Sequence, residues 1–86
     1  MTASLADRVV LVTGGSRGIG AEVAVKAAAE GAIVAVHYNR SADAAQRTLE
    51  RVRASGAEGD CFPADIADGG QAERLVEQVI DRFGRV

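Results

Sequence analysis

The sequence predicts an α/β fold that forms half of a doubly wound parallel sheet. Three short apolar runs alternate with three segments of helical periodicity along the 86 residues. Strands that alternate with helices lie parallel, because each helix carries the chain back across the sheet, and such crossovers are right-handed. We therefore expect a βαβαβα unit with strand order 3-2-1. A chain of this length allows one small domain, so residues 1–86 are treated as a single unit.

The first run, at residues 9–12, is Val-Val-Leu-Val and stops at a pair of glycines. A short, continuous, β-branched run of this kind is typical of a strand that is buried on both faces. Residues 33–36 form a second run of the same kind. Cys61-Phe62 is a weaker third strand, since Pro63 follows it directly.

Between and after these runs, apolar residues recur at helical spacing and capping residues mark the helix ends. Gly31 fits a C-terminal cap for the first helix, and Ser41 is a good N-cap for the second. Asp68 with Gln71 resembles a capping box at the start of the third helix, and Gly84 closes it. The third helix has the clearest apolar stripe, made of Ala72, Leu75, Val76, Val79, Ile80 and Phe83.

Composition excludes several functional classes. The formal net charge of −2 gives no reason to expect nucleic acid or an anionic membrane as a partner. The lone Cys61 rules out an intrachain disulfide and a cysteine-based metal site, and we expect no metal. No apolar run approaches the roughly 20 residues of a membrane span, and no signal peptide is recognisable. We therefore expect a cytoplasmic protein.

The most informative segment is Thr13-Gly14-Gly15-Ser16-Arg17-Gly18-Ile19-Gly20, where the first strand meets the first helix. Glycines at such a junction allow a tight turn, let a phosphate approach the backbone, and let the helix start close to the sheet. The helix N-terminus then offers unpaired N–H groups and partial positive charge to an anion. Strand, helix and second strand in the right order favour a dinucleotide-binding loop over a glycine-rich turn without a ligand. A P-loop is excluded, because Ala21-Glu22 follows where Lys and Ser or Thr would be needed.

The string TGGSRGIG resembles the T-G-x-x-x-G-x-G motif of the short-chain dehydrogenase/reductase family, and Asp65-Ile66 after the third strand also fits that family's pattern. The chain resembles the N-terminal half of such an enzyme, in particular of 3-oxoacyl-carrier-protein reductases and related ketoreductases. The resemblance implies a Rossmann-type fold whose loop is formed by Gly14, Gly18 and Gly20. It also implies that Ser16, Arg17 and Ile19 line the phosphates and ribose, and that Asp65 and Ile66 line the adenine. Taken alone, Asp65 is better explained as a turn or cap carboxylate.

The end of the second strand favours NADP over NAD. NAD-binding proteins usually carry an acidic residue about 20 residues past the glycines, which bonds the ribose 2′-hydroxyl. Here that position reads Tyr38-Asn39-Arg40-Ser41, and the first carboxylate is Asp43. Guanidinium, amide and hydroxyl donors suit a 2′-phosphate, and Arg40 can form a forked, charge-assisted pair with it. Arg17 can approach the same phosphate from the loop.

Alternatives remain for the neighbouring residues. Arg40 can also be a solvated arginine at a helix start, although the helix dipole disfavours a cation there. Tyr38 can donate its hydroxyl to the phosphate or cover the adenosine pocket. His37 can contact the phosphate, whereas a structural hydrogen bond is more usual for a histidine at a strand end.

The family's catalytic residues are absent from these 86 residues. The family uses a Tyr and a Lys four positions apart, with an upstream Ser and Asn; here the only Tyr is Tyr38, followed four positions later by Ala42, and the only Lys is Lys26. No catalytic residue is therefore assigned, and the chain alone is expected to be inactive. Two functions follow as hypotheses: the NADP(H)-binding portion of a reductase that transfers hydride between nicotinamide and a carbonyl or alcohol, or a non-catalytic nucleotide-binding or self-assembling module. An unpaired edge on the first strand would favour self-association.

Overall fold

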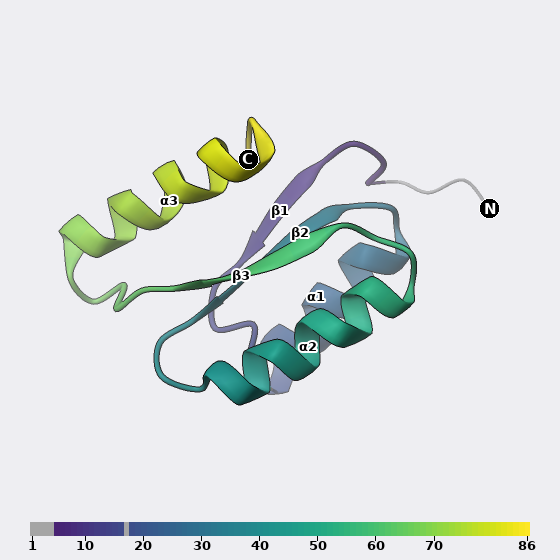
Figure 1. Ribbon diagram of the computed structural model, residues 1–86, viewed down its shortest axis with the longest axis horizontal. Helices are drawn as coiled ribbons and strands as arrows, with labels where there is room; N and C mark the ends of the chain where they lie inside the picture. Colours follow the sequence, from purple (N-terminus) through teal and green to yellow (C-terminus); the bar gives the residue numbers. More distant parts are fainter. Residues whose placement is uncertain (1–4, 17) are drawn as a thin grey trace.

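The computed structural model describes residues 5–16 and 18–86, and it has the predicted alternation of strands and helices (Figure 1). The elements in chain order are β1 (Val9–Val12), α1 (Gly18–Ala29), β2 (Ile33–Tyr38), α2 (Ala42–Ala54), β3 (Gly59–Pro63) and α3 (Gly69–Phe83).

Within the described residues, the strands form one parallel sheet with β2 at its centre. In the register, Val9 lies opposite Ile33, and Val34 lies opposite Gly59. The order β1-β2-β3 is the predicted order 3-2-1 seen from the other edge, so the prediction is confirmed. All strands point the same way, and their carboxyl ends therefore meet at one edge of the sheet.

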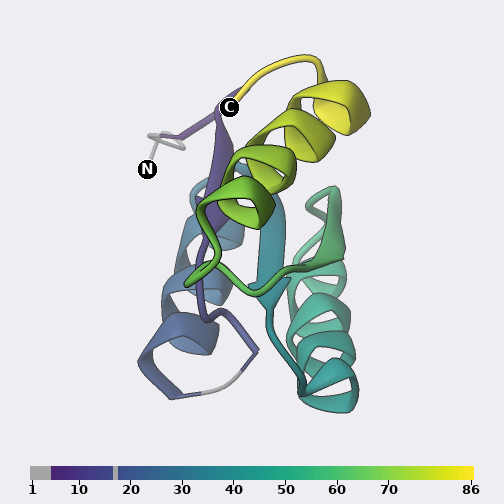
Figure 2. The ribbon, with the colours of Figure 1, turned by 90° about the vertical axis from the view of Figure 1, so that its left-hand side faces the viewer.

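Helices cover both faces of the sheet, as a doubly wound arrangement requires. Figures 1 and 2 show α1 and α2 side by side against one face, with α3 crossing the other. The core on the α1/α2 side is rich in alanine and valine, which lets the helices approach the strands closely; it comprises Val12, Ala24, Ala27, Ala28, Ala32, Val34, Val36, Ala45 and Val52. The α3 side has a smaller core of Val9, Ala35, Phe62, Ala64, Leu75 and Val79.

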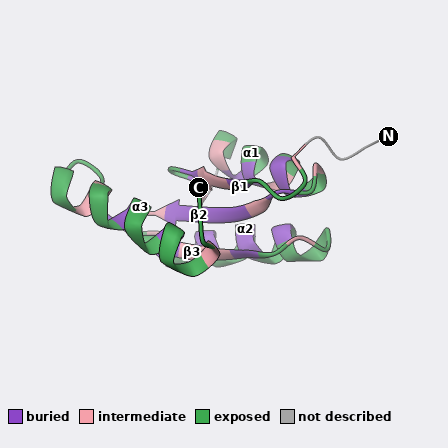
Figure 3. Ribbon diagram, turned by 90° about the horizontal axis from the view of Figure 1, so that it is seen from above, coloured by how far each residue is buried: buried purple, intermediate pink, exposed green. Residues whose placement is uncertain are grey.

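Burial falls off from the centre of the sheet toward its edges. The four middle residues of β2 are buried, and Figure 3 shows this strand as the buried axis of the molecule. In β1, however, Val10 and Leu11 are only partly buried, so the prediction of a strand buried on both faces is wrong for this edge strand. On α3, Leu75 and Val79 are buried, while Val76 and Ile80 of the predicted stripe remain 39% and 40% exposed.

The helix ends follow the predicted caps in most respects. Gly31 has φ of 93°, and the amides of Gly31 and Ala32 donate to the carbonyls of Ala28 and Ala27, which is the Schellman pattern. Gly84 ends α3 in the left-handed conformation. Ser41 occupies the N-cap position of α2, but its side chain makes no capping hydrogen bond.

The start of α3 differs in detail from the predicted capping box. The Asp68 carboxylate accepts a hydrogen bond from the Gly70 amide, as an N-cap should. The Gln71 side chain does not complete the box, because its Oε1 accepts instead from the amide of Asp65 at 2.8 Å. Gln71 therefore ties the helix to the turn that follows β3. The strand before that turn is longer than predicted, since it extends from Gly59 to Pro63.

Candidate cofactor site at the carboxyl edge of the sheet

The described residues that the sequence assigns to a cofactor lie just beyond the carboxyl ends of the strands or at the end of β2. The loop of Gly14 and Ser16 leads from β1 to α1, and residues 38–41 lead from the last residue of β2 to the start of α2. Asp65 and Ile66 follow β3. In open α/β sheets this edge is where ligands bind. Arg17, which the sequence also assigns to the loop, lies outside the described residues.

The glycines of the loop form a cradle that is open to an incoming group. Gly14 and Gly18 have φ of 65° and 63°, and a Cβ built on either would meet no atom within 4 Å. Gly20 instead faces inward, where a Cβ would fall on the carbonyl oxygen of Gly14 and 2.9 Å from its carbonyl carbon. Thus the first two positions leave space for a phosphate beside the backbone, and Gly20 lets the helix pack directly on the loop. The residues present fit a dinucleotide.

Helix α1 points its N-terminus into this cradle. It begins at Gly18, and its first turn contains no acidic residue that would oppose a bound anion. The first amides of a helix lack intrahelical partners and carry partial positive charge. Ile19 in that turn is 85% exposed, so its side chain lies outside the core.

His37, near the end of β2, holds the loop from behind. Its Nδ1 accepts a hydrogen bond from the Gly14 amide at 2.9 Å, and its Nε2 lies 2.8 Å from the carbonyl oxygen of Ala64. Its backbone carbonyl accepts from the Gly15 amide at 3.0 Å. The side chain is 3% exposed. His37 therefore makes the structural hydrogen bonds that are usual for a strand-end histidine, and it does so directly on the loop.

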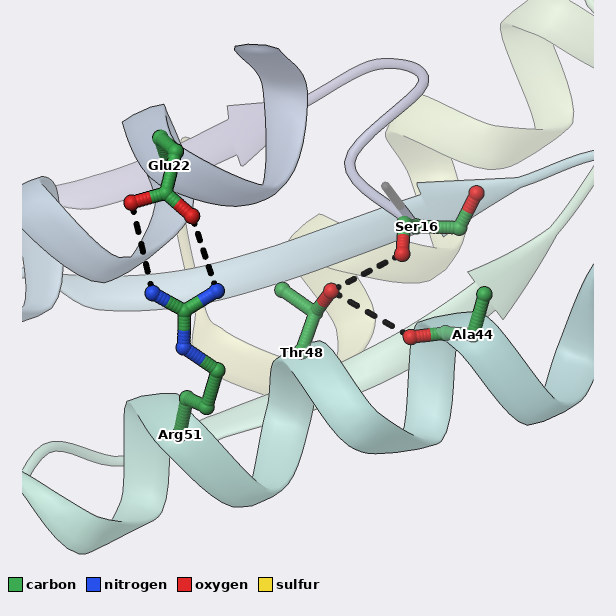
Figure 4. A network of polar contacts seen from close by, with 5 residues as sticks. All are labelled: Ser16, Glu22, Ala44, Thr48 and Arg51. Carbon is green, nitrogen blue, oxygen red and sulfur yellow. Dashed lines mark hydrogen bonds and ion pairs between the residues drawn. The ribbon is translucent and has the colours of Figure 1, made fainter. Parts of the chain in front are cut away.

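Thr48 of α2 supports the loop from the other side (Figure 4). Its Oγ1 lies 3.0 Å from the carbonyl oxygen of Ser16 and 3.3 Å from that of Ala44, so one hydroxyl proton is shared between the loop and the helix. The Thr48 side chain is buried. Sequence reasoning missed this residue, because a threonine inside a helical pattern carries no signal that its hydroxyl will meet a loop 32 positions away.

One turn further along α2, Arg51 pairs with Glu22 of α1 (Figure 4). The Arg51 Nη1 and Nη2 atoms donate to the two carboxylate oxygens at 2.9 and 3.3 Å. The hydrogen bond from Arg51, and then its charge, lower the pKa of the Glu22 carboxyl. Both side chains are exposed, so the pair adds little to stability but sets how α1 and α2 face each other.

The end of β2 and the start of α2 surround a small cavity of about 340 Å³, lined by Arg40, Ser41, Ala42, Asp43, Ala44 and Arg47. Two guanidinium groups against one carboxylate give this cavity a net positive lining. Arg47 was not assigned from the sequence, although its place seven residues after Arg40 and one helical turn after Asp43 could have suggested it. The Tyr38 ring packs partly against the α1/α2 core.

After β3, Asp65 makes local hydrogen bonds. Its Oδ1 accepts from the Ala67 amide at 3.1 Å, a turn contact that agrees with the alternative role noted for this carboxylate. Both Asp65 and Ile66 are exposed at the same edge of the sheet as the loop. A bound adenine can therefore reach them without displacing core side chains.

Cys61 lies inside β3, not in the segments that follow the strands at the carboxyl edge of the sheet. Its Sγ donates to the carbonyl oxygen of Ala45 at 3.4 Å, and burial, with a smaller effect of the nearby Asp60 charge, raises the pKa of the thiol. The thiol is thus held in its unreactive form. Among the described residues, no cluster of His, Cys, Asp and Glu could hold a metal ion. Nor does any helix in that part of the chain have the length and apolarity needed to cross a bilayer.

Comparisons with known proteins place the chain among dehydrogenases. The short chain dehydrogenase family model matches residues 8–86. Hydroxynaphthalene reductase arp2 of Aspergillus fumigatus is 42% identical over 82 residues, which cover 95% of this chain and 30% of that protein. The 3-oxoacyl-[acyl-carrier-protein] reductase FabG of Staphylococcus epidermidis is 39% identical over 80 residues, which cover 93% of this chain and 33% of the reductase.

A solved structure has the same architecture. The crystal structure of a short chain dehydrogenase from Burkholderia cenocepacia J2315 in complex with NADP superposes with a TM-score of 0.89 at 42% identity, covering 93% of this chain and 33% of that one. The present chain therefore spans about a third of the length of the curated relatives that it matches.

Proposed function

Because this chain belongs to the short chain dehydrogenase family, we propose that it is the NADP(H)-binding portion of an oxidoreductase that transfers hydride between nicotinamide and a carbonyl or alcohol. The observation that carries the proposal is the open cradle of Gly14 and Gly18, with the N-terminus of α1 directed into it. A related dehydrogenase of the same architecture was crystallised with NADP, which supports the choice of cofactor.

In this proposal each part of the edge has a role in binding. Amides of the first turn of α1 bind the pyrophosphate, with Ser16, Arg17 and Ile19 beside it. Arg40, with Asn39, Ser41 and Tyr38 around it, binds the 2′-phosphate. Asp65 and Ile66 line the adenine. When bound, the cofactor itself supplies the hydride chemistry, and these residues hold and orient it.

Calorimetric titration of the purified chain with NADPH and NADH tests this assignment. We expect NADPH to bind more tightly than NADH, and Arg40→Ala to weaken NADPH binding by about tenfold while leaving NADH binding unchanged, since a charge-assisted hydrogen bond is worth about 1.5–3 kcal/mol. Arg8→Ala is the matched control, because Arg8 precedes β1 at the opposite edge of the sheet. Equal binding of both cofactors would overturn the 2′-phosphate assignment, and binding of neither would overturn the proposal.

A second candidate function is a non-catalytic nucleotide-binding module that assembles with itself. The observation in its favour is the open outer edge of β1, where Val10 and Leu11 are partly exposed. Beside this edge runs an open groove of about 1100 Å³, to which Leu5, Val10, Ile19 and Val23 contribute apolar surface. An unpaired parallel strand with apolar neighbours pairs readily with another chain. We place both candidate functions in the cytoplasm, where the lone, partly buried thiol of Cys61 would remain reduced.

A further inference from the structure

The imidazole of His37 joins two segments that serve different parts of the proposed cofactor, its pyrophosphate and its adenine. Its Nδ1 contacts the amide of Gly14 in the phosphate loop, and its Nε2 contacts the carbonyl of Ala64, the residue before Asp65. A backbone amide can only donate and a carbonyl can only accept. The ring is therefore the neutral tautomer with its proton on Nε2, accepting from Gly14 and donating to Ala64.

These bonds also decide which amides of the loop remain for a phosphate. His37 takes the Gly14 amide with its ring and the Gly15 amide with its own carbonyl. Two consecutive amides of the loop thus point back into the sheet rather than out to a ligand. The first turn of α1, which starts at Gly18, still offers its amides to the pyrophosphate.

Burial makes this bridge rigid. His37 is 3% exposed and sits on the central strand, between β1 and β3. Every buried side-chain nitrogen or oxygen in the described part of the chain has a partner, and both ring nitrogens of His37 belong to that satisfied set. Loss of either bond would leave a backbone group at the site edge without its partner, and the segment that carries it would be free to shift.

We propose that His37 is a positioning residue that fixes the distance between the glycine loop and the Asp65-Ile66 segment, and so matches the pyrophosphate and adenine ends of the site to one cofactor. This inference rests on the proposed function. The ring touches neither end of the cofactor itself. It acts through the backbone of Gly14 and Ala64.

Three substitutions separate the two bonds. His37→Asn keeps an acceptor near the position of Nδ1 for Gly14 but is too short to reach Ala64. His37→Gln extends a donor toward Ala64 but leaves Gly14 without an acceptor. His37→Leu fills the space and makes neither bond. NADPH and adenosine 2′-monophosphate are the probes, because the second ligand has the adenine end and no pyrophosphate.

We expect His37→Gln to bind adenosine 2′-monophosphate as the wild type does but to bind NADPH about tenfold more weakly, the usual effect of one lost hydrogen bond at a buried group. His37→Asn should weaken the monophosphate and keep the wild-type ratio between the two dissociation constants. His37→Leu should weaken binding of the monophosphate, and it should weaken NADPH binding by a still larger factor. Calorimetry gives the dissociation constants of both ligands for the wild type and the three variants.

Amide hydrogen exchange supplies a measurement that needs no ligand. The Gly14 amide should be protected in the wild type and in His37→Asn, and should exchange faster in His37→Gln and His37→Leu. A His37→Gln variant that weakens both ligands by the same factor, with Gly14 protected as in the wild type, would overturn the inference while leaving the proposed function intact. A wild-type chain that binds neither ligand would overturn the proposed function and this inference with it.

Discussion

At the scale of single residues, the glycines of the loop have different tasks although the motif treats them alike. Gly14 and Gly18 adopt positive φ with open space around them. Gly20 has an ordinary φ but contacts the loop backbone, so that even a methyl group would not fit. The first kind of position demands an unusual conformation, and the second demands absence of volume. Substitution at the two kinds of position should therefore lower the free energy of unfolding by different amounts.

We expect Gly20→Ala to lower the free energy of unfolding by about 3 kcal/mol, because overpacking against a backbone cannot be relieved by a side-chain movement. Gly18→Ala should cost only about 1 kcal/mol, the strain of a left-handed alanine. Gly69→Ala is the control, since it has neither positive φ nor a near neighbour. Urea unfolding of the three variants measures these differences. Equal destabilisation at positions 18 and 20 would contradict the assignment of roles.

The sequence predicted the position of the loop but not the contacts that hold it. The TGGSRGIG string marks a strand-to-helix junction, which depends on local backbone chemistry. The hydrogen bonds from Gly14 to His37 and from Thr48 to Ser16 span 23 and 32 positions, and they depend on how the elements pack. No periodicity or spacing in the chain encodes them. The role of His37 was open from the sequence for the same reason.

At the scale of elements, α2 supports the glycine loop as well as covering the sheet. Thr48 contacts the Ser16 carbonyl, and one turn later Arg51 contacts Glu22 of α1. The two contacts hold α1 and α2 together along one side, beginning at the loop (Figure 4). The helix that follows β2 thus shapes a site that begins at the end of β1.

Removal of the Thr48 hydroxyl should loosen this support. Thr48→Val keeps the shape of the side chain and leaves the Ser16 carbonyl without its donor, so we expect a loss of about 1 kcal/mol in stability. NADPH binding should weaken severalfold, as measured by calorimetry. Thr48→Ser, which retains the hydroxyl, is the control. Wild-type affinity in Thr48→Val together with weaker binding in Thr48→Ser would show that packing of the methyl group, not the hydroxyl, supports the loop.

The pair between Arg51 and Glu22 should act only above acidic pH. Folding lowers the pKa of the Glu22 carboxyl, so its contribution is present above the pKa of the unfolded chain and is lost as pH falls through the folded value. We expect Glu22→Gln to be slightly less stable than the wild type at pH 7 and equally stable near pH 2. Urea unfolding at both pH values measures the difference. A gap that persisted at the acidic pH would contradict an electrostatic origin.

The elements themselves were predictable to different degrees. The ends of α1 and α3 were predicted well from their capping glycines. A positive φ is a local requirement, and a glycine in the sequence indicates directly where it can be met. The apolar stripe of α3 predicted burial at two positions where the side chains are exposed. Val76 and Ile80 belong to the periodicity, but they remain exposed in the described structure. Periodicity reports which residues suit burial. Only the tertiary arrangement decides which of them are buried.

At the scale of the whole molecule, the sheet formed by the described residues ends at β1, whose outer edge has no partner strand among them. The strand order could be predicted, because parallel strands with right-handed crossovers leave few alternatives. The partner of the outer edge of β1 could not be predicted, because the sequence does not show which segment or which other chain pairs with an edge strand. This edge is the basis of the proposed self-association.

We expect the chain to form dimers or larger species whose mean mass increases with concentration, as measured by light scattering after size exclusion. Val10→Lys, which places a charge on the partly exposed edge strand, should shift the distribution toward the monomer. Gln78→Lys provides a matched control, because it adds the same charge at an exposed position of α3, away from β1. A monomeric mass at every concentration would contradict the proposed self-association.

The strand order has one more consequence. Each strand pairs with the strand that follows it in the chain, β1 with β2 and β2 with β3. Paired residues such as Val9 and Ile33 are therefore about 24 positions apart, and less chain entropy is lost before contacts form than if β1 paired with β3. On the ribosome, β1, α1 and β2 can come together as soon as Tyr38 has left the exit tunnel, before β3 has been made. The half of the fold that carries the glycine loop is thus able to form first, while translation of the remaining residues continues.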